Sequence, residues 1–501
     1  MGNVYQGEGG GAPDPITALI HDLKVTVHCS SLLFPPEQTE RKCMFLSNID
    51  QVLDLDVETV HFFRSHPDFP PEILPDKLKI AYQKLLVPYN FLAGRLKMNA
   101  EVGRLEIDCN DAGVGYVVAS SEYALDEIGD LVYPNPAFRQ LITQNPNFLG
   151  KDDRPLCVIQ VTTFKCGGFV MGVSTNHTTF DGISFKHFLQ NLAAVASGKP
   201  LFIPPCNQRE LLSARSPPRV TFPHPELLKL KLPIGHNLRS PIPFGADTTA
   251  AANNGNGNGA PSPPLPALPP LPELEQEEQL DIKIFKLTPS QISHLKDKAK
   301  SANSKVRATG FNVVTALIWC CKALSCIQPN DVKDHITSDS STILYAVDIR
   351  PRLNPPLPPS YTGNAVLTGY ATATREELDG GAEWWRLVEM VSEGSTRMTN
   401  DYARSAIDWG ELYRGFPHGD VLVSSWWRLG FADIEYPWGR PHYSCPVVYH
   451  RKDIILLFPN IVDDGDGAKA KDVDTGVNVL VALPPKEMEK FHSLFHKFLL
   501  P

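Results

Sequence analysis

The sequence has no excess of basic side chains: 47 lysines and arginines stand against 56 aspartates and glutamates, for a net charge of −9. Nucleic-acid-binding proteins concentrate positive charge on one face, so this balance argues against a nucleic-acid partner. A local basic patch that binds one anionic ligand stays compatible with it. With 42% hydrophobic and 21% charged residues, the chain is typical of a soluble globular protein.

Long apolar runs are also missing. No stretch approaches the roughly 18 apolar residues that a membrane-spanning helix needs. The start, MGNVYQGEGGGAPDPITALI, has no basic region followed by an apolar run, so we expect neither a membrane span nor a secretory signal. The ten cysteines form no C-x-x-C pair, which favours buried reduced thiols and predicts a cytoplasmic protein.

The chain shows no internal repeat, and its clearest boundary is compositional. Residues 241–279 read PIPFGADTTAAANNGNGNGAPSPPLPALPPLPELEQEEQ, a composition that cannot bury enough apolar surface to fold by itself. A chain of 501 residues is also too long for one core. We therefore predict an N-terminal domain (residues 1–240), a flexible linker (241–279) and a C-terminal domain (280–501).

Both predicted domains mix strands with helices. Two β-branched runs, residues 157–164 and 167–176, meet at Gly-Gly and predict a hairpin. In the second half, Thr288-Pro289 is typical of a helix start, and FNVVTALIWCCKAL (311–324) is apolar on nearly every side, which predicts a buried helix. Because strands and helices do not alternate regularly, we predict an α/β fold with two mixed layers rather than a doubly wound sheet.

The stretch STNHTTFDGISF (174–185) places His177 and Asp181 between a predicted strand and a predicted helix, where chemistry often concentrates. A zinc site needs at least three protein ligands, and the motif has no other His or Cys that could serve as the third ligand beside His177 and Asp181. The neighbouring GVSTN lacks the second glycine of the hydrolase motif G-x-S-x-G. These points leave a catalytic base or an ordinary structural histidine.

Several motifs in order make the chain similar to one family. HTTFDG matches the H-x-x-x-D-G motif of the plant BAHD acyltransferases, and the other matching segments are LSNIDQ (46–51), LLVPYNFLAGRL (85–96), VDIRPRLNPPLPPSYTGN (347–364) and SSWWRLGFADIEYPWGRP (424–441). The resemblance covers nearly the whole chain. It implies two chloramphenicol-acetyltransferase-like mixed-sheet domains with the active-site channel between them.

The resemblance also implies an activity. Family members move an acyl group, such as a hydroxycinnamoyl or another aromatic or aliphatic group, from coenzyme A to a hydroxyl of a specialised plant metabolite. Acyl-CoA is then a co-substrate, no cofactor or metal is bound permanently, and the protein is a monomer. Two alternatives stay open: N-acylation of an amine or polyamine, and a non-catalytic accessory role.

Residue roles follow from the same resemblance. His177 is implied as the general base, without a covalent intermediate. Asp181 is implied as structural support that points away from the site, although an orienting carboxylate is the alternative. Ser424 is the candidate that stabilises the oxyanion, with Ser425 nearly equivalent. The candidates for cofactor binding are Lys305, Arg307, Thr309, Ser425, Trp426, Trp438 and Gly439.

One motif departs from the family, because EYPWG (435–439) stands where D-F-G-W-G is usual. The family's aspartate is held to an arginine, so the resemblance implies an ion pair of Glu435 with Arg350, or with Arg352 as the alternative. Proline fixes φ near −65° and removes an N–H donor. We expect an altered loop that keeps its ion pair. Gly182 is expected to permit a backbone turn that other residues avoid.

Overall fold

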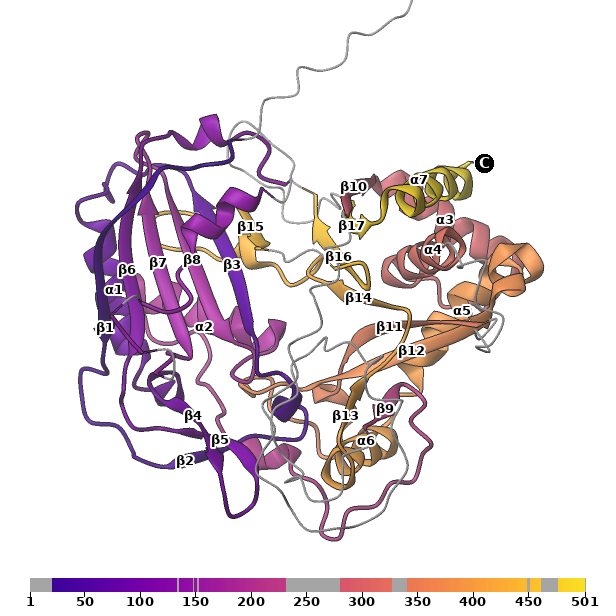
Figure 1. The fold of residues 1–501 in the computed structure, drawn as a ribbon, viewed down its shortest axis with the longest axis horizontal. Helices are drawn as coiled ribbons and strands as arrows, with labels where there is room; N and C mark the ends of the chain where they lie inside the picture. Colours follow the sequence, from indigo (N-terminus) through magenta and orange to yellow (C-terminus); the bar gives the residue numbers. More distant parts are fainter. Residues whose placement is uncertain are drawn as a thin grey trace, which may run out of the picture.

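The computed structural model describes residues 20–132, 135–146, 148–150, 153–230, 280–326, 340–447, 451–460 and 476–500. The predicted linker, residues 241–279, lies outside these ranges. Two six-stranded mixed sheets dominate the described residues, one in each half of the chain (Figure 1). This is the predicted fold class, with two α/β domains built on mixed sheets.

The first sheet has the strand order β1-β6-β7-β8-β3-β15. Its strands are β1 (Val25–Leu33), β3 (Asp56–Phe63), β6 (Val114–Ser121), β7 (Cys157–Thr163), β8 (Phe169–Asn176) and β15 (Tyr443–Pro446). β7 and β8 pair antiparallel, which confirms the predicted hairpin. Every residue of β8 is buried, including the polar Ser174, Thr175 and Asn176 at its end, because this central strand is covered on both faces.

Two helices cover one face of this sheet. They are α1 (Leu74–Leu85) and α2 (Gly182–Ala196), which pack against each other over an aromatic-rich core. The opposite face is covered by the short helices η3 (Leu125–Ile128) and η4 (Pro136–Leu141). A separate small sheet has the order β2-β5-β4 and consists of β2 (Cys43–Phe45), β4 (Arg95–Asn99) and β5 (Arg104–Asp108).

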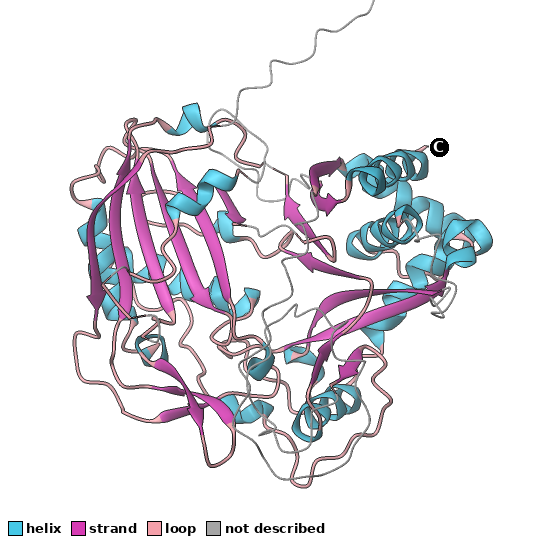
Figure 2. Ribbon diagram, viewed as in Figure 1, coloured by secondary structure: helices cyan, strands magenta, loops and turns pink. Residues whose placement is uncertain are grey.

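The second sheet has the strand order β10-β17-β16-β14-β11-β12. Its strands are β10 (Asp281–Leu287), β11 (Ser340–Asp348), β12 (Val366–Thr374), β14 (Val421–Ser425), β16 (Ile454–Pro459) and β17 (Val477–Leu483). Its helices lie on the side away from the first half (Figure 2). They are α3 (Pro289–Ala302), α4 (Gly310–Ser325), α5 (Trp384–Thr396) and α7 (Pro485–Leu499).

Both helix predictions in this half are confirmed. Thr288 caps α3, accepting a hydrogen bond from the Gln291 N–H, and Pro289 is its first residue. All residues of α4 are buried except Phe311 and Leu324, as an all-round apolar helix requires. Within the described ranges, no helix combines the length and apolar character that crossing a membrane demands.

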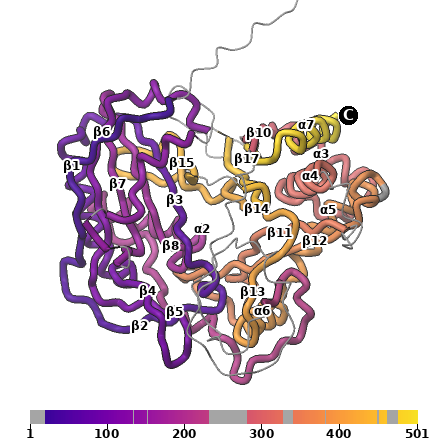
Figure 3. Tube along the Cα trace, in the orientation of Figure 1, coloured from indigo at the N-terminus to yellow at the C-terminus, as the bar shows by residue number. Residues whose placement is uncertain are grey.

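The two halves exchange short segments, as Figure 3 shows for β15, which lies against the indigo-to-magenta half. β15 comes from the second half and pairs antiparallel with β3 of the first sheet. In return, β9 (Leu227–Lys229) pairs with β13 (Gly415–Pro417), next to α6 (Asn400–Leu412). The predicted boundaries at residues 240 and 280 stay predictions, but these pairings show that the two halves are interleaved.

A buried histidine joins β15 to β3. His61 is 1% exposed, with Nδ1 2.9 Å from Ser444 Oγ of β15 and Nε2 3.2 Å from Thr59 Oγ1. Burial, which penalises the charged imidazole, lowers the pKa of His61 from 6.5 to about 3. The strand contributed by the second half is therefore held through a histidine that must be neutral.

This lowered pKa makes stability depend on pH. As the pH falls below about 6.5, His61 of the unfolded chain takes up a proton before that of the folded chain, so stability declines until about pH 3. We expect His61 alone to remove about 2 kcal/mol of unfolding free energy between pH 7 and pH 5. Denaturant unfolding at both pH values should show a fall smaller by that amount in His61→Gln, which cannot be protonated. An equal fall in both proteins would contradict this assignment.

Candidate active site

The HTTFDG loop connects the end of β8 to the start of α2. Asp181 is the N-cap of α2, and its side chain accepts a hydrogen bond from the Ser184 N–H at 2.9 Å, which satisfies one of the free donors of the first turn. At the other end, the Asn176 Oδ1 accepts from the Thr178 N–H at 3.0 Å. Local hydrogen bonds thus close both ends of the loop around His177.

His177 is held through both polar groups of its backbone. Its N–H donates to the Leu55 carbonyl at 2.7 Å, and its carbonyl accepts from Asn364 Nδ2 at 2.8 Å. Because Asn364 belongs to the second half, the loop lies where the halves meet. The side chain is half-buried, and within the described part of the chain its enclosed Nδ1 has no hydrogen-bond partner. No described carboxylate therefore orients this ring in the manner of a hydrolase triad.

Asp181 is engaged by a buried arginine. Arg350 Nη1 lies 2.8 Å from Asp181 Oδ2, the two side chains are 5% and 4% exposed, and Arg350 Nη2 donates to Oδ1 at 3.0 Å. The Ala365 N–H donates to Oδ2 at 2.9 Å. Burial alone would raise the pKa of Asp181, but Arg350 and the N–H groups of Ala365 and Ser184 outweigh it, so this pKa is lowered. The carboxylate is thus ionised and ties the start of α2 to the second half.

The predicted ion pair between Glu435 and Arg350 is wrong. Glu435 is exposed and pairs with Arg440 at 2.6 Å, while Arg350 binds Asp181 and Asp348. The alternative partner, Arg352, donates instead to backbone carbonyls, including that of Ser395 at 2.7 Å. The physical reason is that a buried guanidinium needs charge compensation at close range, and Asp181 already supplies it.

The EYPWG segment forms a tight turn. The N–H of Tyr436 donates to the Gly439 carbonyl at 3.2 Å, and the N–H of Gly439 donates back at 3.0 Å. Gly439 has φ +97, a conformation that favours glycine, and Pro437 follows Tyr436 where a turn needs no N–H donor. The substitution of proline for the family's glycine is therefore compatible with a well-formed turn.

Trp438 lies in the core of the first half. It is 3% exposed, stacks on Tyr436 at a centroid distance of 5.4 Å, and meets Phe63, Phe69 and Phe169 edge-on. A side chain buried this completely has little surface to offer a ligand. Its predicted contact with the cofactor is therefore not supported, and its observed role is packing.

The two candidate serines lie at the end of β14 and point to opposite faces of the second sheet. Ser425 is in register with Leu457, which belongs to the core under the helices, whereas Ser424 is in register with Leu456 on the opposite face. That face is turned toward the first half, and the half-buried Trp426 packs against apolar residues of both halves. Strand alternation thus separates two residues that the sequence left nearly equivalent.

The predicted cofactor residues Lys305, Arg307 and Thr309 are exposed and lie just before α4. Thr309 is the N-cap of α4, with its hydroxyl accepting from the Asn312 N–H at 3.1 Å. The start of α4 also approaches the segment after β14: a Cβ on Gly310 would stand 3.2 Å from the Trp427 ring and 3.7 Å from Arg428 Nη2. The structure therefore adds the exposed Arg428 to this basic surface, which the sequence did not indicate.

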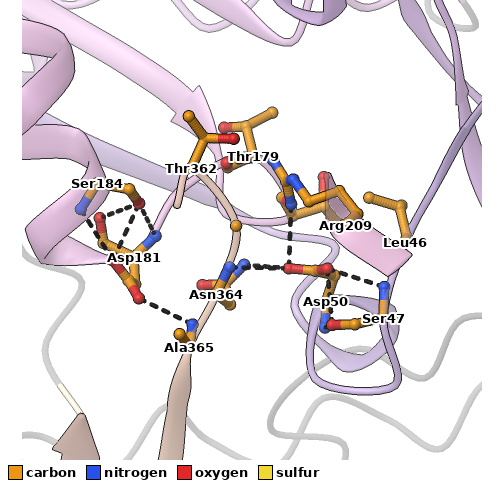
Figure 4. A network of polar contacts seen from close by, with 12 residues as sticks. Leu46, Ser47, Asp50, Thr179, Asp181, Ser184, Arg209, Thr362, Asn364 and Ala365 are labelled. Atoms are coloured by element: carbon orange, nitrogen blue, oxygen red, sulfur yellow. Dashed lines mark hydrogen bonds and ion pairs between the residues drawn. The ribbon is translucent and has the colours of Figure 1, made fainter. Parts of the chain in front are cut away.

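Sequence reasoning missed a second buried polar cluster beside the loop (Figure 4). Asp50, Arg209 and Asn364 are 0%, 0% and 1% exposed. Asp50 lies in LSNIDQ and Asn364 in the PSYTGN end of the fourth matching segment, so both stood in quoted motifs without a role. Arg209, in the short helix η5 (Arg209–Leu212), carried no signal at all.

Gly182 does not have the expected turn conformation, since it is absent from the positive-φ glycines among the described residues. Its lack of a side chain matters for packing instead. A Cβ there would stand 2.8 Å from Leu429 Cδ1, so the glycine allows the first turn of α2 to approach the segment that follows Trp426.

Known proteins match this chain over nearly its whole length. The model of a family described as the Transferase family matches residues 23–240 and 259–498. The chain belongs to this family, the plant BAHD acyltransferases. Acyltransferase GLAUCE of Arabidopsis thaliana is 56% identical over 99% of both chains. The shikimate O-hydroxycinnamoyltransferase of Nicotiana tabacum is 30% identical over 95% of this BAHD chain and 100% of its own.

Solved structures agree with the fold of this BAHD acyltransferase. Vinorine synthase superposes with a TM-score of 0.65 at 23% identity, over 94% of this chain and 98% of its own. TRI101 of F. graminearum, complexed with coenzyme A and T-2 mycotoxin, gives a TM-score of 0.61 at 14% identity, over 90% and 97% of the two chains. At these identities the likeness supports the two-domain architecture alone.

Proposed function

We propose that this chain is a coenzyme A-dependent O-acyltransferase in which His177 is the general base. The observation that carries the proposal is the state of the HTTFDG loop. Its imidazole is half-buried where the two halves meet, and its backbone is held at both polar groups. The neighbouring carboxylate is already taken by Arg350. Of the histidine and the aspartate of the motif, only the imidazole is therefore available for proton transfer.

The chemistry needs one proton removed from a poor nucleophile. A hydroxyl oxygen of the acceptor attacks the thioester carbonyl carbon while His177 takes the hydroxyl proton, and histidine is the side chain that most often serves as a general base. The tetrahedral oxyanion then collapses, the C–S bond breaks, and the thiolate leaves and takes up a proton. Because thiols have pKa values near 8.5, this departure needs little assistance. Both substrates meet at one histidine, so no acyl-enzyme is required.

Ser424 is proposed to stabilise the oxyanion. Strand alternation directs it to the sheet face turned toward the first half, whereas Ser425 is directed to the helix-covered face. A hydroxyl donor aimed at developing negative charge lowers the barrier of acyl transfer. Half-buried Trp426, which packs on both halves, is proposed to form part of the wall beside it.

Coenzyme A is proposed to bind with its phosphates near the start of α4. Lys305 and Arg307 are exposed there, Thr309 caps the helix, and Arg428 lies beside Gly310. Helix N-termini and guanidinium groups both favour phosphate oxygens. For Ser425 and Gly439, the place near the cofactor stays a prediction.

The proposed substrates are an aromatic acyl-CoA and a hydroxylated acceptor. Relatives at 30% identity are named a shikimate O-hydroxycinnamoyltransferase, an omega-hydroxypalmitate O-feruloyl transferase and a fatty alcohol:caffeoyl-CoA acyltransferase. These names share a hydroxycinnamoyl-type donor and differ in the acceptor.

We also propose that the protein is a monomer located in the cytoplasm. All ten cysteines are free, three of them exposed, which suits a reducing compartment.

A donor and acceptor panel tests the proposed function. Purified protein is incubated with acetyl-, p-coumaroyl-, caffeoyl- and feruloyl-CoA, each with shikimate, a fatty alcohol, an ω-hydroxy fatty acid or spermidine. We expect CoA release that depends on a hydroxylated acceptor and is largest with a hydroxycinnamoyl donor. Mass spectrometry of the product is preferred to a thiol reagent, because the exposed cysteines would react. Acylation of spermidine alone would favour N-acyl transfer, and no product from any pair would refute the proposal.

A further inference from the structure

We propose that Asn364 is a positioning residue that holds the His177 loop against the second half of the chain. The inference rests on the proposed role of His177 as base. Asn364 does not touch the reacting groups, but it fixes the backbone of His177, the proposed base. The segment that contains it, Thr362–Ala365, directly precedes strand β12 of the second sheet.

The amide of Asn364 makes two bonds that only a donor can make. Its Nδ2 lies 2.8 Å from the His177 carbonyl oxygen and 2.8 Å from Asp50 Oδ1. Both neighbours are acceptors, so the NH₂ end of the amide must face them. The side chain is 1% exposed, and buried hydrogen bonds to a charged group are among the stronger ones.

Asp50 keeps Asn364 in this orientation. Its Oδ1 also accepts the Asn364 backbone N–H at 3.1 Å, and its Oδ2 accepts the N–H and hydroxyl of Ser47 at 2.9 and 2.8 Å. Arg209 Nη1 lies 3.4 Å from Oδ1, with both side chains fully buried. The carboxylate is thus compensated by donors from separate parts of the chain, which makes its position well defined.

Arg209 also binds the backbone of the His177 loop. Its guanidinium donates to the carbonyls of Thr178 and Thr179 at 3.2 and 2.8 Å. Gly363 allows this approach, because a Cβ there would stand 2.7 Å from Arg209 Nη1. The carbonyls of three consecutive loop residues, His177 to Thr179, are therefore held by Asn364 and Arg209.

The segment Thr362–Ala365 also holds the far end of the loop. The Ala365 N–H donates to Asp181 Oδ2 at 2.9 Å, and the Gly363 carbonyl accepts from Arg350 at 3.1 Å. One short segment of the second half thus holds the loop through hydrogen bonds on both sides of His177. A shift of about 1 Å in a catalytic group can reduce a rate by about 100-fold. These hydrogen bonds therefore determine how efficiently His177 acts as a base.

The test compares Asn364→Ala with a matched control, Ser47→Ala. Each variant loses a buried hydrogen bond to Asp50, but only Asn364→Ala loses the bond to the His177 carbonyl. With the best donor and acceptor pair, well below the melting temperature, we expect kcat of Asn364→Ala to fall by about 10- to 100-fold. The KM for acyl-CoA should stay within about 3-fold, since the buried amide offers a ligand no surface, and Ser47→Ala should keep its kcat within about 3-fold.

Two results would overturn the inference: a kcat for Asn364→Ala within 3-fold of the wild type, or an equal loss in Ser47→Ala, which would reduce the cluster to a general structural role. His177→Ala is measured in parallel. If His177→Ala is inactive while Asn364→Ala stays active, the positioning role of Asn364 is refuted and the proposed function stands. If His177→Ala keeps full turnover, the role of His177 as general base is refuted. Should Asn364→Ala not fold, Asn364→Ser, which retains a small polar group, is judged by the same criteria.

Discussion

Replacing His177 with alanine is expected to lower kcat for acyl transfer by about 10²- to 10⁴-fold, the usual contribution of a positioned general base. The protein should still fold, because the contacts that hold this residue are made by its backbone N–H and carbonyl. Binding of coenzyme A, measured by calorimetry, should stay within about 3-fold, since the imidazole acts on the acceptor. Steady-state rates across a range of acyl-CoA concentrations give kcat.

The matched control for this experiment is His28→Ala. His28 is exposed on β1, the edge strand of the first sheet, where its Nε2 lies 2.7 Å from Ser120 Oγ. It should leave kcat unchanged while removing an imidazole of the same chemistry. A His177→Ala variant that keeps more than about a tenth of the wild-type kcat would contradict the mechanism.

Replacing Arg350 with alanine is expected to lower the free energy of unfolding by about 3–5 kcal/mol. The variant leaves the Asp181 carboxylate buried without its cation, and removing one partner of a buried pair is much more costly than removing both. The loss also frees the carbonyls of Tyr361 and Gly363, which accept from Arg350 at 3.2 and 3.1 Å. Denaturant unfolding followed by circular dichroism measures the change.

The variant Glu435→Ala distinguishes the observed ion pair of Glu435 with Arg440 from the ion pair with Arg350 that the family resemblance implied. The Glu435–Arg440 pair is exposed, at 63% and 36% for the two side chains, and such pairs contribute at most about 1 kcal/mol. We therefore expect Glu435→Ala to unfold nearly as the wild type does. If it were as destabilised as Arg350→Ala, the assignment of Asp181 as the partner would be wrong.

Much of the fold could be predicted because it depends on local pattern. The β7–β8 hairpin follows from two β-branched runs around Gly-Gly, and the buried helix α4 from a segment that is apolar on nearly every side. Hydrophobic burial acts on these patterns directly, so a periodicity read along the chain is sufficient. The HTTFDG motif likewise indicated a loop between a strand and a helix, and Asp181 caps that helix.

The failures concern choices of partner. Arg350, Arg352, Arg440 and Arg209 are chemically alike along the sequence, and the choice of Asp181 for Arg350 over Glu435 depends on which carboxylate shares its buried position. The cofactor contact predicted for Trp438 from its motif is a separate case: it stays a prediction, which the packing of this side chain among other aromatic rings does not support.

By itself, the sequence determined the fold class, the family and the histidine on which the proposed chemistry depends. The tertiary structure alone decided which face of the second sheet Ser424 occupies, and it alone brought Asp50, Arg209 and Asn364 together behind the loop of that histidine. The reason is physical. Patterns of burial act between near neighbours in the chain, whereas a buried charge or amide is satisfied by whichever group the packing of distant segments places within about 3 Å.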